Sequence, residues 1–104
     1  MKKGIRRSDR VYVRIPVLLR GVDANGTSYA EKGSIVALSM HGAAVEIGRP
    51  LEMGMAVTID TAQSLRFEAV VVWIGNDMSK TGGQYGVECM GLADSLGFHF
   101  PPAQ

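Results

Sequence analysis

Apolar residues recur at every second position through most of this chain. In the first long segment Val11, Val13, Ile15, Val17 and Leu19 alternate with positions of more polar or mixed character. A period of two is typical of β-strands with one buried face, whereas an amphipathic helix repeats every 3.6 residues. No convincing helix of ten residues appears anywhere. The alternation therefore predicts an all-β protein.

Six strands are predicted, and most of the turns between them contain glycine. They cover residues 11–20, 29–38, 43–47, 55–60, 65–74 and 85–89. Pro16 lacks a backbone N–H, which places it at a strand edge or at a bulge. Leu65 and Trp73 share the inward phase of the fifth strand, and Cys89 that of the sixth. The residues expected to be largely buried are Val13, Val45, Val57, Phe67, Val71 and Val87.

Six short antiparallel strands favour a small closed barrel, because closure removes exposed sheet edges. A chain of 104 residues fits one domain. We expect a barrel domain over residues 11–100, a basic N-terminal arm over 1–10 and a short tail over 101–104. The arm is predicted to be flexible, since it is polar, lacks periodicity and carries charges that repel one another.

Charge is distributed unevenly along the chain. Residues 1–20 hold seven of the eleven basic side chains and one acid, for a net charge of +6, whereas the rest of the chain sums to −5. Guanidinium groups match phosphate and carboxylate geometry, so such an arm suits a compact anion. A solvated tail that only keeps the protein soluble explains the same charge.

Catalytic and metal-binding patterns are absent from the sequence. Ser39 and His41 lie two apart, but no acid is placed to orient the imidazole. His41, Cys89 and His99 match no familiar zinc spacing. We therefore expect no enzyme activity, no metal and no cofactor. No stretch of eighteen apolar residues and no signal peptide is found, which predicts a cytoplasmic protein without membrane insertion.

Two short segments carry the most specific signal. Residues 6–10 read Arg-Arg-Ser-Asp-Arg, an R-x-x-x-R spacing directly before the first strand, and residues 37–42 read Ala-Leu-Ser-Met-His-Gly, with an S-x-x-G spacing between two strands. In this order and separation the pair resembles the PilZ domain, a family of six-stranded barrels that act as bacterial receptors for cyclic di-GMP. Segments 51–54, 71–73, 85–88 and 97–102 extend the resemblance over nearly the whole chain.

The resemblance implies a binding site and a signalling role. Arg6 and Arg10 would clamp the nucleotide from an arm that closes on binding, and Arg7 would add charge or stack on a base. Ser39 would offer a hydroxyl, and Gly42 would let the backbone turn with positive φ and let the ligand approach closely. The signal would pass to a protein partner that the sequence does not identify. For Ser39 and Gly42, a plain tight turn is the alternative.

One departure from the family pattern bears on function. The S-x-x-G segment usually opens with Asp or Asn, which bonds a guanine edge, and Ala37 stands there instead. Three functions follow: a cyclic di-GMP receptor, a PilZ domain that has lost the nucleotide and serves as a protein-interaction module, and a nucleic-acid-binding barrel. The last is disfavoured, and no nucleic acid is expected as partner, because most of the seven aromatic residues are predicted to lie in the core.

Overall fold

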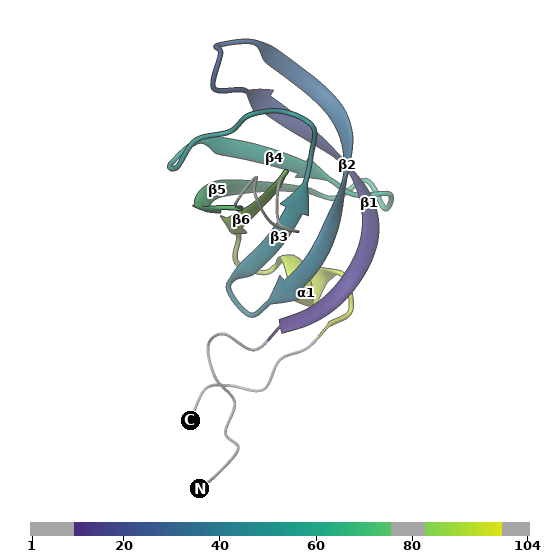
Figure 1. The fold of residues 1–104 in the computed structure, drawn as a ribbon. Helices are drawn as coiled ribbons and strands as arrows, with labels where there is room; N and C mark the ends of the chain where they lie inside the picture. Colours follow the sequence, from purple (N-terminus) through teal and green to yellow (C-terminus); the bar gives the residue numbers. More distant parts are fainter. Residues whose placement is uncertain (1–9, 76–82, 99–104) are drawn as a thin grey trace, which may run out of the picture.

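The computed structural model describes residues 10–75 and 83–98, whose strands form one closed antiparallel barrel (Figure 1). Around the barrel the strand order is β1-β2-β3-β6-β5-β4, and β4 returns to β1. The predicted all-β barrel of six strands is confirmed. Its elements are β1 Arg10–Val22, β2 Ser28–Ser39, β3 Gly42–Glu46, β4 Ala56–Asp60, β5 Arg66–Ile74, β6 Gln84–Glu88 and a short helix, α1 Leu92–Ser95.

The inward faces of the strands fill the barrel with aliphatic side chains. The alternation holds well in the middle of each strand, and the residues with no exposed surface include Leu19, Ile35, Val45, Val57 and Ile59. Of the predicted core residues, Val45, Val57, Val71 and Val87 are buried, whereas Val13 and Phe67 are partly buried and pack against the cluster. The predicted inward phase is therefore correct at these six positions.

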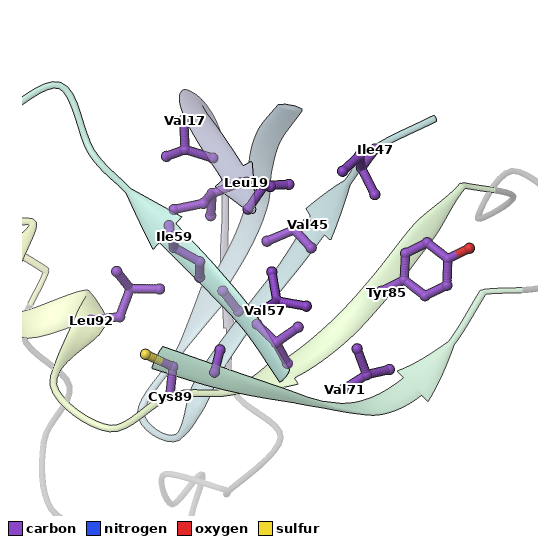
Figure 2. Close-up of a cluster of buried hydrophobic side chains, with 14 of the residues drawn as sticks. Val17, Leu19, Val45, Ile47, Val57, Ile59, Val71, Tyr85, Cys89 and Leu92 are labelled. Carbon is purple, nitrogen blue, oxygen red and sulfur yellow. The ribbon is translucent and has the colours of Figure 1, made fainter. Parts of the chain in front are cut away.

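Side chains from α1, from β6 and from the segment after β3 close the two ends of the barrel. Leu92 of α1 is fully buried and lies near Cys89 at one end of the core, whereas Ile47 and Tyr85 lie at the other end (Figure 2). The Tyr85 hydroxyl donates to the carbonyl of Arg49 at 3.0 Å and accepts the N–H of Leu51 at 3.1 Å. The short helix was not predicted, but with four residues it agrees with the absence of any long helical pattern.

A buried carboxylate organises the turn between β1 and β2. Asp23 is 3% exposed, and its Oδ1 accepts the backbone N–H of Asn25 at 2.9 Å and of Thr27 at 3.0 Å. The Arg49 side chain donates to Oδ2 of Asp23 at 3.2 Å and to Oε1 of Glu31 at 2.8 Å. The N–H groups, with help from Arg49, hold the pKa of Asp23 below its usual value, against the opposing effect of burial.

Three residues of the predicted inward phase are exposed, and one of them, Val11, is 37% exposed near the start of β1. Trp73 is 45% exposed, because the β5–β6 register shifts between Val71 and Trp73 and the extra residue reverses the alternation. Leu65 is 40% exposed, because it precedes β5 in a turn where its backbone bonds both the backbone and the hydroxyl of Thr61. The three inward assignments were wrong.

Pro16 lies where β1 is irregular and unpaired on one side. The β1–β2 register shifts between Tyr12 and Ile15, and β4 pairs with β1 only over Leu18–Gly21. Pro16 therefore lies beside a bulge and outside the segment of β1 that pairs with β4. This agrees with the prediction made from its missing N–H.

The described strands begin one residue inside the predicted arm and end at Glu88, within the predicted barrel domain. Residues 1–9, 99–104 and most of the predicted loop over 75–83 lie outside the described residues, so the flexibility of the arm stays a prediction. In the described part, no helix has the length and apolar character needed to cross a membrane.

Candidate functional site

A groove of about 760 Å³ crosses the outer faces of five strands, β1, β2, β3, β6 and β5. Its size lies within the range usual for small-molecule sites. Strand pairing arranges the residues of this face in three tiers along the barrel axis: a hairpin tier near the β2–β3 turn, a middle tier and a far tier.

The middle tier has a floor of small residues between two aromatic side chains. Ala37 of β2 pairs with Tyr12 on one side and with Ala44 on the other, and Ala44 pairs with Gly86. Gly86 in turn lies opposite Trp73, whose ring covers the position where a Cβ of Gly86 would stand. Tyr12 is 77% exposed. Such a floor with aromatic flanks has the shape and chemistry that a planar ring requires.

The hairpin tier brings together three of the five predicted site residues. Arg10 is paired with Ser39 across β1 and β2, and Ser39 and Gly42 flank the β2–β3 turn. The Ser39 hydroxyl donates to the Gly42 carbonyl over a long 3.4 Å. His41 and Glu88 line the groove at this end. The other two predicted residues, Arg6 and Arg7, lie outside the described residues.

Gly42 is required for a reason other than the one expected. Its φ is not positive, so the expected left-handed turn is wrong. A Cβ at Gly42 would instead stand well inside van der Waals contact with the carbonyl oxygen of Val87. The close approach of β3 and β6 therefore excludes any side chain at this position, whether or not a ligand binds.

Ala37 stands on the floor of the groove. It is 4% exposed, lines the groove and lies next to Tyr12 and Ala44, both on the outer face. A longer side chain at this position would project toward the groove from β2. The presence of Ala37 in place of Asp or Asn therefore removes a polar group from the groove and not from the barrel core.

The far tier is a row of three polar side chains. Nη1 of Arg14 bonds Oε1 of Glu46 at 2.9 Å, and Gln84 is paired with Glu46 across β3 and β6. The Arg14 guanidinium and, to a lesser extent, the neighbouring Gln84 amide lower the pKa of Glu46 against the opposing effect of burial, so this group is a carboxylate at neutral pH. Arg14 and Gln84 line the groove.

The groove residues that sequence reasoning missed include Tyr12, Arg14, Trp73 and Gln84. Tyr29 and Tyr85 are buried, as expected of most aromatic residues. Tyr12, which the alternation placed on the outward side of its strand, and Trp73, which it placed inward, are both exposed. The phase of Arg10, Tyr12 and Arg14, which alternate on the outward side of β1, carried a signal for two of them. For Trp73 the alternation gave no such signal, because the bulge turns its side chain to the outer face.

Cys89 is buried, and burial raises the pKa of its thiol. Among the described residues, no group of three or more histidine, cysteine or acidic side chains is placed to hold a metal ion. The chemistry of this face is therefore that of hydrogen bonding, charge and stacking.

Comparisons with known proteins agree on one family. A family model described as "PilZ domain" matches residues 5–97. A crystal structure of the PilZ domain of CeSA from a cellulose-synthesizing bacterium is 27% identical in sequence, with a TM-score of 0.55, and the match covers 80% of this chain and 81% of that chain. No curated protein matches the chain.

Proposed function

Because this chain belongs to the PilZ domain family, a family of receptor modules, we propose that it binds cyclic di-GMP in the groove across β1, β2, β3, β6 and β5. The observation that carries the proposal is the groove itself. Residues Arg10 and Ser39 meet at one end of it, next to a floor without long side chains and two exposed aromatic rings.

Each part of the groove suits one part of the ligand. Cyclic di-GMP carries two phosphates and two guanines. Arg10, with Arg6 and Arg7 from the arm, supplies the cations for phosphates or for guanine O6 and N7. Tyr12 and Trp73 supply flat apolar surfaces for bases, which stack on aromatic rings of this kind.

The signal would leave the domain through its arm. Arg6 and Arg7 stand directly before β1, so closing of the arm over the bound nucleotide would change the surface that a protein partner meets. Exposed apolar residues on the outer face of β5, Val70 and Val72, offer such a partner a contact surface.

Titration calorimetry with cyclic di-GMP tests the proposal. The wild-type domain should bind, and Arg10→Ala should abolish measurable binding, because a charged hydrogen-bond donor at the groove is lost. Arg66→Ala is the matched control, since Arg66 lies on another face of the barrel and lines a different hollow. It should bind as the wild type does.

Ala37→Asn should tighten binding by about tenfold, the effect of one regained hydrogen bond to a guanine edge. Asn is a cleaner substitution than Asp, which would add a negative charge beside an anionic ligand. No binding by the wild type at millimolar nucleotide, and none created by Ala37→Asn, would exclude the receptor function.

The methyl group of Ala37 on the groove floor favours a second function. A PilZ domain that has lost this polar contact would serve as a protein-interaction module without nucleotide. In that case the exposed apolar residues of β5 would be its working surface, and the titration above would show no heat of binding in any variant.

A further inference from the structure

The far tier of the groove contains no residue of the two family motifs, yet it carries an ion pair between Arg14 and Glu46. Arg14 belongs to β1 and Glu46 to β3, so their bond crosses the outer face of β2. Gln84 of β6 extends the row, because it is paired with Glu46 in the β3–β6 ladder. Arg14 and Gln84 thus line this end of the groove, and the Glu46 carboxylate bonds Arg14 beside it.

The row is electrically neutral. Arg14 contributes one positive charge, the Glu46 carboxylate cancels it at 2.9 Å, and Gln84 adds none. A phosphate approaching Arg14 would meet the carboxylate as well, so the attraction of the arginine is largely offset. A neutral group with hydrogen-bond acceptors carries no net charge for the Glu46 carboxylate to repel. The far tier therefore suits a base edge better than a phosphate.

Arg14 also retains donors for a ligand. Its bond to Glu46 uses Nη1, which leaves Nη2 and Nε for a pair of acceptors. The side chain is 63% exposed and is held in place by the carboxylate. A guanidinium held in this way donates two parallel bonds without losing much further rotational freedom.

We infer that Arg14, positioned by Glu46 and flanked by Gln84, reads the O6 and N7 edge of a guanine at the far end of the groove. This inference rests on the proposed function and adds a specificity-determining residue to it. Guanine presents two acceptors on that edge, whereas adenine presents N7 and the N6 amino donor, which would face the donors of Arg14. The far tier would therefore make the groove select guanine over adenine.

The experiment compares cyclic di-GMP with cyclic di-AMP by calorimetry, at several salt concentrations, on the wild type, Arg14→Ala and Glu46→Gln. We expect Arg14→Ala to weaken cyclic di-GMP binding about tenfold, to change cyclic di-AMP binding little, and to leave the salt dependence unchanged. Arg66→Ala is the control. Its side chain is 62% exposed and is paired with Asp60, much as Arg14 is paired with Glu46.

Glu46→Gln provides a second, milder change that keeps the shape of the row. Without the carboxylate, the row carries a net positive charge and attracts the phosphates of either ligand. The ratio of the two affinities should then fall at least about threefold, with a steeper salt dependence.

The outcomes separate the two proposals. If the wild type binds neither nucleotide, the proposed function fails and this inference fails with it. If the wild type binds cyclic di-GMP but Arg14→Ala has no effect, only the inference fails. An equal loss for both nucleotides, with a weaker salt dependence, would mark Arg14 as a phosphate contact and would also overturn it.

Discussion

At Gly42 a single hydrogen atom in place of a side chain allows β3 and β6 to approach each other. The carbonyl of Val87 occupies the space where a Cβ would be, and this carbonyl belongs to the backbone and not to a flexible side chain. The glycine of the S-x-x-G segment is therefore needed by the fold alone. A glycine at this position is therefore evidence for the barrel fold more than for ligand binding.

Gly42→Ala should destabilise the domain by about 1–3 kcal/mol, the usual cost of forcing extra volume into a packed site. Urea unfolding of the variant and the wild type measures the difference. Gly54→Ala is no suitable control, because its φ of +83° strains any side chain, whereas Ala44→Gly probes the same strand without a clash. An unfolding free energy equal to that of the wild type would show that β3 and β6 separate at little cost.

At the scale of elements, the β1–β2 hairpin depends on the ionised form of Asp23. Its carboxylate accepts two backbone N–H groups and an Arg49 bond, which lower its pKa from the ordinary value of 3.8. For a carboxyl with a lowered folded pKa, the stabilisation is fully present above the unfolded pKa. It is lost as the pH falls through the folded pKa.

We therefore expect the Tm to fall as the pH drops below about 4, and Asp23→Asn to flatten this acid limb and to lower the Tm at neutral pH. Differential scanning calorimetry between pH 2.5 and 7 measures both effects. Glu52→Gln, at an exposed position, is the control. The paired Asp60 adds to the acid limb, since Arg66 and Arg20 lower its pKa as well, so Asp23→Asn should flatten the limb only in part.

Elements were predictable where one physical rule decides them and unpredictable where two rules compete. The alternation of Val45 with its neighbours in β3 reports burial directly, and the prediction for that strand was confirmed. In β5 the alternation continues through Trp73 in the sequence, but the bulge after Val71 cancels it. A bulge leaves no trace in the pattern of apolar residues, so the exposure of Trp73 beside the groove could not be predicted from the sequence.

At the scale of the whole molecule, α1 closes the barrel end next to Cys89. Leu92 has no exposed surface, although its helix has only four residues. Helices this short are not stable alone, so the burial of Leu92 holds α1 in place and α1 in turn shields the core.

Leu92→Ala should lower the free energy of unfolding by about 2–5 kcal/mol, the range for removing a buried leucine side chain. Met90→Ala, at a position 68% exposed, is the nearby control and should change stability little. Urea unfolding of both variants tests this. Equal effects of the two substitutions would show that α1 does not contribute to the closed barrel.

The strand order has a consequence for how the molecule opens. The barrel consists of two three-stranded meanders, β1-β2-β3 and β6-β5-β4, joined edge to edge along β3–β6 and β1–β4. These two seams connect residues far apart in the sequence, such as Gly42 with Glu88 and Leu18 with Asp60, so they form slowly in folding. The groove floor at Ala44 and Gly86 straddles the β3–β6 seam. A molecule seated there touches both meanders and opposes their separation, so amide hydrogen exchange along β3 and β6 would slow as the groove fills, even where no amide touches the ligand.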